Sequence, residues 1–170
     1  MSDTHTSLDS RFFRTALGRF ATGVTVVTAA APDGTPIGMT VSSFNSVSLN
    51  PPLILWSLSL RSTSLAVFEY CERYVVNVLS AEQIALARHF ATGDTRERFN
   101  DVPQRFAPAG TPMLDEQCAA WFECRNRSRY IEGDHVIMVG EVEQCGHSPA
   151  SPLVFHAGGF DLTPASKASS

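Results

Sequence analysis

The chain has 170 residues, of which 44% are hydrophobic and 18% are charged, and its formal net charge is −4. That length suits a single domain, and the apolar fraction is too high for an intrinsically disordered chain. The acidic balance argues against nucleic-acid binding, which normally needs a basic surface. No apolar run approaches the roughly 18–20 residues that cross a bilayer, so we expect no association with a membrane.

The cysteines and the first residues of the chain indicate the redox state of the protein and its cellular location. The four cysteines form no CxxC pair and no spacing typical of a zinc site: Cys71, Cys118, Cys124 and Cys145. We therefore expect reduced thiols, no metal and a cytoplasmic location, since the first residues also lack a signal-peptide pattern. Small polar residues predict flexible segments at 1–10 and 163–170, with one domain over 11–162.

The first predicted element is a helix capped by Asp9 or Ser10. Its apolar residues recur at helical spacing: Phe12, Phe13, Ala16, Leu17 and Phe20. Alternating β-branched residues predict a strand over 24–28, and Pro32-Asp33-Gly34 predicts a turn after it. Further strands are expected over 37–44, 53–60 and 74–79, with a short helix near 65–69.

The second half of the chain continues the β pattern. Ser80 with Gln83 is typical of a capping box for a helix over 81–90, and residues 94–99 predict a helical turn. Strands over 119–131, 135–145 and 153–156 complete the chain, with a hairpin turn at Gly133-Asp134. Short strands joined by tight turns, with few helices, predict a mainly β domain: a β-barrel with helices packed outside it.

Hydroxyl side chains are concentrated in two segments, 38–52 and 57–64. A buried hydroxyl without a hydrogen-bond partner costs about 1–3 kcal/mol, so each needs a donor or acceptor nearby. In the first segment the hydroxyls bond neighbouring backbone in turns, or a polar ligand lies along the strand; both interpretations stay open. In the second, which leads into a helix, the alternatives are a phosphate cradle and ordinary capping.

Three runs of sequence carry a resemblance to a known family: RTALGRFATGVTVVT at 14–28, GMTVSSFNSVSLNPP at 38–52 and YVVNVL at 74–79, followed by Gly133-Asp134-His135 and Gly140. In this order, over residues 11–162, the chain resembles the short-chain flavin reductases, the reductase components of two-component flavin monooxygenases. The resemblance implies an FMN-binding split β-barrel with Greek-key-like connections, assembled as a homodimer.

The resemblance also implies which residues contact the flavin and the nicotinamide. Three groups would hold FMN or FAD: Gly38, Met39, Thr40, Ser42 and Ser43 at the ring and ribityl chain, Ser57, Leu58, Ser59, Thr63 and Ser64 toward the phosphate, and His89 with Phe90 near the phosphate. The nicotinamide pocket would be lined by His135, Phe155, His156, Ala157 and Gly158, with His135 as the catalytic residue.

Two of these assignments have a plainer alternative. His135 is also suited to a hairpin, and His156 to a core or interface position. Gly159-Phe160 stands where the family often has an Arg-Tyr-like pair, which favours NADH over NADPH as the donor.

The function implied by the resemblance is hydride transfer from NADH, or alternatively NADPH, to FMN or FAD. The reduced flavin would pass to a partner monooxygenase. Because the flavin supplies the hydride chemistry, the missing Ser–His–Asp pattern does not argue against an enzyme. Two alternatives remain: a bound flavin that reduces a corrin or an iron complex, and a flavin-binding protein without catalysis.

Overall fold

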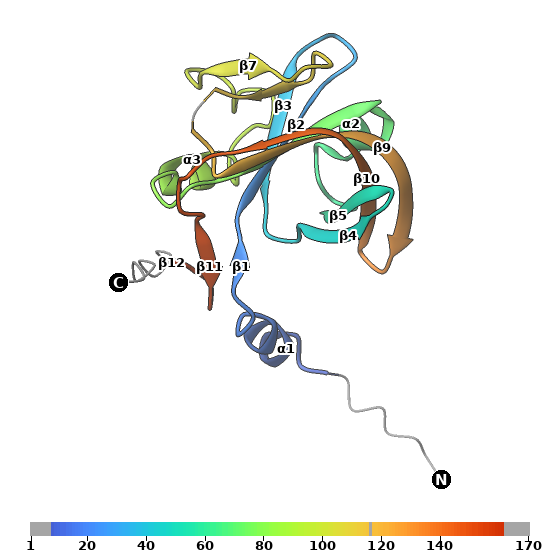
Figure 1. The fold of residues 1–170 in the computed structure, drawn as a ribbon. Helices are drawn as coiled ribbons and strands as arrows, with labels where there is room; N and C mark the ends of the chain where they lie inside the picture. The colour runs from blue at the N-terminus through green and yellow to red at the C-terminus, as the bar shows by residue number, and fades with distance from the viewer. Residues whose placement is uncertain (1–7, 116, 162–170) are drawn as a thin grey trace.

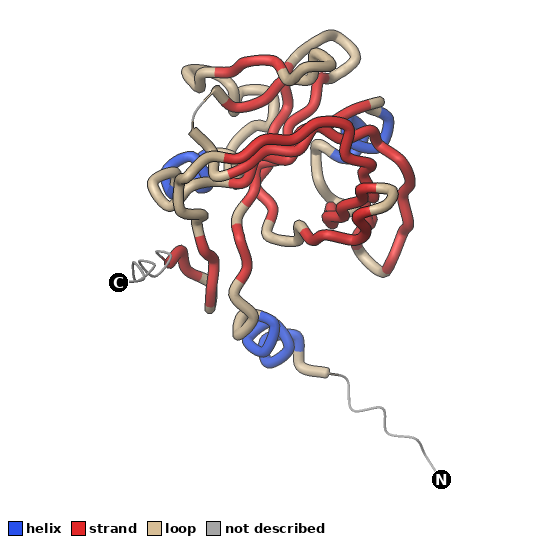
Figure 2. Tube along the Cα trace, in the orientation of Figure 1, coloured by secondary structure: helices blue, strands red, loops and turns tan. Residues whose placement is uncertain are grey.

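The computed structural model describes residues 8–115 and 117–161. Within them the chain forms a curled β-sheet with three short helices at its periphery (Figure 1; Figure 2). The helices are α1 (Ser10–Leu17), α2 (Leu65–Tyr70) and α3 (Ile84–His89). The strands are β1 (Thr22–Gly23), β2 (Thr25–Ala30), β3 (Pro36–Val41), β4 (Asn45–Leu49), β5 (Pro52–Ser59), β6 (Arg73–Val78), β7 (Gln104–Phe106), β8 (Pro112–Leu114), β9 (Ala120–Glu132), β10 (His135–His147), β11 (Val154–His156) and β12 (Gly159–Asp161).

Seven of these strands form one antiparallel sheet in the order β3-β2-β6-β9-β10-β5-β4. The two edge strands, β3 and β4, follow each other in sequence, so the sheet starts and ends at one short connection, residues 42–44. The long central strands β9 and β10 carry register shifts between Val139 and Gly140 and between Val142 and Gln144. Such irregularities bend strands, and the sheet curls until its edges approach each other.

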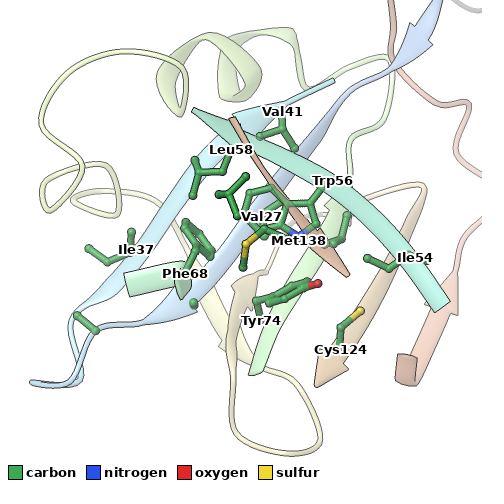
Figure 3. Packing of buried hydrophobic residues seen from close by; sticks show 14 residues of the cluster. Val27, Ile37, Val41, Ile54, Trp56, Leu58, Phe68, Tyr74, Cys124 and Met138 are labelled. Atoms are coloured by element: carbon green, nitrogen blue, oxygen red, sulfur yellow. The ribbon is translucent and has the colours of Figure 1, made fainter. Parts of the chain in front are cut away.

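One apolar core fills the inside of the curled sheet (Figure 3). It combines Ile37 of β3 and Trp56 of β5, from opposite ends of the sheet, with Tyr74, Met138 and Phe68 from elements between them. Side chains from both ends can meet in one cluster only if the sheet closes around them. Among the described residues no ladder joins β3 to β4, so the closure is incomplete. This is the predicted mainly β fold, a split β-barrel in one domain.

A second cluster packs on the outer face of β2. There Val26 lies with Leu79, with Phe90 at the end of α3, and with Phe99 of the 94–99 turn. β2 is therefore covered on both faces, because Val27 points into the barrel. A strand buried on both sides needs apolar or β-branched residues at every position, which explains its unbroken run.

Most predicted boundaries shift by one or two residues, and two elements, a strand and a helix, have a boundary that shifts by three. The strand predicted over 37–44 ends at Val41, because the chain crosses there from one sheet edge to the other. The helix predicted over 81–90 begins only at Ile84. The predicted Ser80–Gln83 bond does form, with the Ser80 N–H donating to Gln83 Oε1 at 2.8 Å. It closes the turn that precedes the helix.

The first helix stands away from the barrel (Figure 1). Asp9 caps it as predicted, since its carboxylate accepts from the Arg11 N–H at 2.8 Å. None of the residues of α1 is buried. Its C-terminal end is tied to the turn between β11 and β12, where the Ala157 N–H donates to the Gly18 carbonyl at 2.9 Å.

The predicted flexible ends fall mostly outside the described residues, which leave out 1–7 and 162–170. Residues 8–10 are described and lead into α1. Within the described part of the chain, no helix is long and apolar enough to cross a membrane.

Candidate functional site

A hollow of about 400 Å³ lies beside the connection between the two sheet edges. Residues 20–23 form one wall and residues 42–45 the other. Its volume falls within the range of about 300–1,000 Å³ that is usual for small-molecule sites. Thr22 Oγ1 is buried and has no hydrogen-bond partner among the described residues. A buried hydroxyl in that condition is costly, so the structure is locally unsatisfied at this wall.

The hydroxyls of the first serine- and threonine-rich segment divide between the two interpretations. Thr40 Oγ1 donates to the Ala87 carbonyl at 2.7 Å and ties β3 to α3. Ser43 Oγ donates to the Ser57 carbonyl at 3.1 Å and accepts from the Ser57 N–H at 2.9 Å. These two side chains therefore join backbone segments. Ser42 is exposed at the hollow, and no hydrogen bond of its hydroxyl is found within the described residues.

The predicted flavin contacts on β5 alternate between the two faces of the strand. Leu58 is fully buried in the barrel core, so only its main chain can reach a ligand. Ser57 and Ser59 point to the opposite, half-buried face. Met39 of β3 packs partly against the core. The sequence could not separate these cases, because the resemblance assigns contacts to whole segments.

The second hydroxyl group connects the start of α2 with the 94–99 turn. The hydroxyl oxygens of Thr63 and Thr95 lie 2.7 Å apart, and either can donate. Ser62 Oγ accepts from the Ser64 N–H at 3.2 Å. Ser64 precedes α2 and makes no side-chain cap. The segment is thus held by local bonds, and Thr63 remains exposed at the surface.

Arg98 organises the corner between β3, α3 and this turn. Its guanidinium donates to the carbonyls of Gly38, Thr92 and Gly93 at 3.0, 2.9 and 3.2 Å. Partial burial lowers the pKa of Arg98. Its own carbonyl lies 2.7 Å from His89 Nε2, so two predicted flavin residues, Gly38 and His89, meet at one arginine. From the sequence alone Arg98 is most simply a solvated residue of the charged 94–99 turn, whereas in the structure its guanidinium holds three carbonyls.

Phe90 is enclosed at the same corner. Its ring is fully buried and packs edge-on against Phe99, with centroids 5.0 Å apart. A Cβ on Gly38 would come within 2.6 Å of the Phe90 ring, so only glycine allows β3 to pass so close. The rings of Phe90 and Phe99 therefore shape the corner. A ligand can reach Phe90 only through its main chain.

His135 begins β10, directly opposite Ser59 of β5 in the ladder. Opposite residues of an antiparallel pair share a face, so the predicted catalytic histidine and a predicted flavin residue are neighbours. His135 Nδ1 lies 2.6 Å from Asp134 Oδ1. This hydrogen bond lowers the pKa of Asp134, which keeps the carboxylate ionised beside the ring. The histidine side chain is exposed.

The predicted nicotinamide segment lies next to the hollow through β1. Phe155 pairs with Thr22 in the ladder, and its ring packs edge-on against Phe160 at 5.5 Å. His156 ends β11 and is half-buried. Ala157 and Gly158 form the following turn with φ values of 50° and 81°. Ala157 is thus an alanine in the left-handed region, a conformation that favours glycine.

The separate segments therefore meet along one continuous path. β11 borders β1, β1 forms a wall of the hollow, and the hollow leads through Ser43 to Ser57 on β5. Two positions farther along β5, Ser59 faces His135. The sequence analysis missed Thr22 and the other residues of its wall. The signal available was a hydroxyl immediately before Gly23, at the point where the helix gives way to a strand.

These observations define a class: a split-barrel protein with a hydroxyl-lined, nucleotide-sized site at the gap between its sheet edges. The family described as the flavin reductase like domain matches residues 17–163. The chain belongs to that family.

Individual relatives agree with this assignment. The chain is 45% identical over 152 residues to an FMN reductase (NADH) of Agrobacterium fabrum, covering 89% of this chain and 85% of that protein. It is 39% identical over 155 residues to a flavin reductase of Pseudomonas putida, covering 91% and 90% of the two chains. Among solved structures, an NADH:FAD oxidoreductase of Streptomyces globisporus in complex with NAD and FAD fragments matches with a TM-score of 0.85. The identity is 34%, and the match covers 94% of this chain and 96% of that one.

Some relatives are longer than this chain. It spans 49% of the reductase component of a flavin-dependent trigonelline monooxygenase of Acinetobacter baylyi, to which it is 36% identical over 155 residues.

The described residues fit a flavin. The hollow has a suitable volume, an orphaned hydroxyl at Thr22, an exposed hydroxyl at Ser42, and the half-buried ring of Phe44 in its wall. The flavin ring system is both aromatic and polar. It needs apolar walls to pack against and a few polar groups that fix its orientation.

Proposed function

We propose that this protein transfers a hydride from NADH to FMN or FAD and supplies the reduced flavin to a separate monooxygenase. The observation that carries the proposal is the hollow at the split of the barrel, where residues 20–23 face residues 42–45 and the exposed Ser42 hydroxyl is available to a ligand. Family membership and the relatives named FMN reductase and reductase component support it. NADH rather than NADPH is favoured by Gly159-Phe160, which offers no cation for a 2′-phosphate.

In this proposal the chain contributes binding and orientation. Thr22, Ser42 and Ser43 would hold the ring at the hollow, with the residues from Ser57 to Ser64 and His89 toward the phosphate. The flavin supplies the hydride-accepting chemistry when it is bound. The protein therefore needs to hold the nicotinamide against the ring in a reactive geometry, which accounts for much of the rate of such reactions.

His135 would position the nicotinamide. The ionised Asp134 carboxylate can only accept a hydrogen bond, so Nδ1 of His135 carries the proton. This orients the ring and leaves Nε2 as the nitrogen available to a ligand. The carboxamide of a nicotinamide has an N–H donor that matches it.

The direct test is anaerobic stopped-flow absorbance of the flavin band. One equivalent of FMN or FAD is mixed with the protein, and NADH or NADPH is then added. Rapid bleaching with NADH is the expected result, and it also selects the flavin. Clear flavin binding with no bleaching beyond the rate of the protein-free mixture would refute the reductase and favour a flavin-binding protein.

The cofactor position is tested with Ser43→Leu. The bulky side chain would intrude on the hollow and remove the bonds to Ser57, so we expect flavin affinity to fall at least tenfold, about 1.4 kcal/mol. Thr63→Leu tests the phosphate end in the same way. The matched control is Ser46→Leu, since Ser46 is an exposed serine on β4 that does not line the hollow. Unchanged flavin affinity in both variants would refute the placement.

The role of His135 is tested with His135→Ala and Asp134→Asn. We expect the first to raise the KM for NADH or slow hydride transfer while sparing flavin affinity. The second should give a smaller effect of the same kind, because it removes only the group that orients the ring. His147→Ala is the control, since His147 is an exposed histidine at the opposite end of β10. Normal reduction kinetics in His135→Ala would remove His135 from the site.

The proposal includes a homodimer formed through α1. Phe12, Phe13 and Leu17 are 69%, 48% and 58% exposed on a helix that the barrel does not cover. A contiguous apolar face of this kind is typical of a protein contact. A second copy of the chain fits it, because a helix that projects from each protomer can pack on the other in a self-complementary way.

The proposal also places the protein in the cytoplasm. No disulfide joins cysteines in the described residues, and Cys124 is buried among apolar side chains. Unpaired thiols are typical of a reducing compartment. Thiol counting on protein denatured under acid quench should find four free thiols per chain in cell extracts; disulfides would contradict this location.

A further inference from the structure

Most arginine side chains of the protein have a partner. Five pair with carboxylates: Arg73, Arg96, Arg105, Arg125 and Arg127. Three others bind carbonyl oxygens or lie over a ring: Arg88, Arg98 and Arg129. Of the remaining four, Arg61 interacts electrostatically with the Asp134 carboxylate. The side chains of Arg11, Arg14 and Arg19 have no partner among the described residues, and all three border the same hollow.

That hollow has a volume of about 280 Å³ and lies between α1 and the β11–β12 turn. Arg11, Arg14 and Arg19 contribute one side of it, and Ala157 with Gly158 contributes the other. Within the described part of the chain, no acidic residue lines it. Three cations in one hollow with no carboxylate among them repel one another, and an anion would remove that repulsion.

The hollow is built by a specific contact. The carbonyl of Gly18 accepts from the Ala157 N–H at 2.9 Å, which fastens the end of the helix to the turn. A Cβ on Gly18 would lie 3.6 Å from the Cα of Ala157, so the helix and the turn are in close contact. Residues 157 and 158 both adopt positive φ at this point. The cations therefore face a turn of fixed shape.

The two faces of α1 have different chemistry. Residues 11, 14, 15 and 18 recur at spacings of three and four, so they share the side that lines the hollow. Phe12, Phe13 and Leu17 occupy the other side and are exposed. A single helix thus presents arginines to the β11–β12 turn and an apolar surface away from it. An apolar face packed on a second copy would leave the arginines available to a ligand.

We infer that Arg11, Arg14 and Arg19 form a cradle for the pyrophosphate of a dinucleotide bound at the reductase site. Guanidinium groups bind phosphate oxygens through paired, charge-assisted hydrogen bonds, and a pyrophosphate matches a cradle of several cations better than a single carboxylate does. The inference rests on the proposed function, because the cradle includes Ala157 and Gly158 of the proposed nicotinamide segment. The pyrophosphate belongs to NADH or to FAD, and the test separates these sources.

The first experiment measures steady-state kinetics of the full chain and of its Arg11→Gln, Arg14→Gln, Arg19→Gln and triple variants. With NADH and FMN, the triple variant should show a KM for NADH at least tenfold higher and an unchanged kcat. With 1-benzyl-1,4-dihydronicotinamide, which carries the hydride donor without phosphates, all variants should match the wild type. Arg127→Gln is the control for loss of one surface charge, since its partner Glu141 keeps Arg125.

Exchanging the flavin identifies the source of the pyrophosphate. If the cradle holds NADH, the KM defect appears with FMN and FAD alike. If it holds FAD, the defect appears in the KM for FAD, while FMN and NADH are unaffected. A triple variant with wild-type KM values for all three compounds overturns the inference, although flavin reduction by the wild type would leave the proposed function standing.

The second experiment is independent of catalysis. Calorimetry with inorganic pyrophosphate should show binding to the wild type that weakens with added salt, and at least tenfold weaker binding to the triple variant. Equal binding to both proteins overturns the inference even if the reductase is inactive. Binding of poly-glutamate that is lost in the triple variant, with pyrophosphate binding unchanged, would also overturn it and indicate an acidic protein surface as the occupant.

Discussion

The barrel differs from the α1 corner, by which we mean α1 together with the β11–β12 turn, in where its side chains find their contacts. In the barrel, residues from both ends of the sheet meet in one buried cluster, and Trp56 contacts Phe68 and Tyr74 edge-on at 5.1 and 5.6 Å. At the corner, α1 has no buried residue, its phenylalanines are exposed, and its arginines have no described partner. The two regions are joined through β1 and the single hydrogen bond between Ala157 and Gly18.

The difference separates folding from binding. The buried aromatic rings of the barrel pack against one another within the chain, so the barrel accounts for stability. The α1 corner leaves both apolar and charged groups for contacts from outside, which is typical of surfaces that bind ligands or other chains. Substitutions in the barrel should therefore change the free energy of unfolding, and substitutions at the corner should change binding and assembly.

The largest effect on stability is expected for Trp56→Ala. The side chain is fully buried, and its loss leaves a cavity that the surrounding β-strands cannot close. We expect the free energy of unfolding to fall by about 3–5 kcal/mol in urea denaturation. The control is Phe106→Ala, an exposed aromatic at 67%, which should change stability by less than about 0.5 kcal/mol. Equal losses in the two variants would contradict the assignment of stability to the barrel.

Gly38→Ala should have the next largest effect. Its Cβ would lie 2.6 Å from the ring of Phe90, which is held in place by Phe99 and cannot swing away. Overpacking of this kind costs about 1–3 kcal/mol, again measured in urea. Gly23→Ala is the matched control, because a Cβ there meets nothing within 4 Å. A stable Gly38→Ala variant with impaired flavin binding would instead make Gly38 a ligand contact.

Much of the barrel could be predicted because its signals are local. The β-branched run of β2, the turn at Gly34 and the hairpin at Gly133 each follow from a few neighbouring residues, and both glycines have the positive φ that such turns need. The strands β1, β4, β7, β8 and β12 were not predicted; four of them have only two or three residues, which carry no periodicity. The early end of β3 was missed because the crossing at residues 42–44 depends on the distant Ser57.

The site was predicted less completely, for a related reason. Sequence showed that Thr40, Ser43 and Thr63 carry hydroxyls, but their actual partners, Ala87, Ser57 and Thr95, are 14 to 47 residues away. Burial of Leu58 and Phe90 also depends on which strand face turns inward. The arginine cradle was invisible because its other side comes from residues 157–158. Contacts between residues far apart in sequence decide which polar groups have a partner within the chain. The polar groups that lack one define the site.

The third prediction concerns assembly. The double variant Phe12→Ser/Phe13→Ser removes two exposed rings of α1, so we expect the dimer dissociation constant to rise at least tenfold, about 1.4 kcal/mol. Sedimentation velocity across a dilution series measures it. The unfolding free energy of the monomer should change by less than about 0.5 kcal/mol, since neither ring is buried. Phe106→Ser is the control, and a dimer as tight as the wild type would show that α1 is not the interface.

The smallest effect is expected at Asp33, a charged group of the barrel that, unlike the arginines of α1, has its partners within the chain. The Thr35 side chain and N–H donate to the Asp33 carboxylate, and Arg96 adds a charged donor at 3.0 Å; together they lower the pKa of Asp33 to about 2. A depressed folded-state pKa contributes stability above the unfolded pKa of about 3.9, and that contribution disappears as the pH falls toward 2.

In urea titrations, wild type and Asp33→Asn should therefore have the same stability near pH 2, and the wild type should be the more stable from about pH 5 upward. Arg96→Gln should retain most of this pH dependence, because the Thr35 donors are the larger cause. Parallel curves for wild type and Asp33→Asn would mean that the turn, like the cradle, leaves its charge without an internal partner.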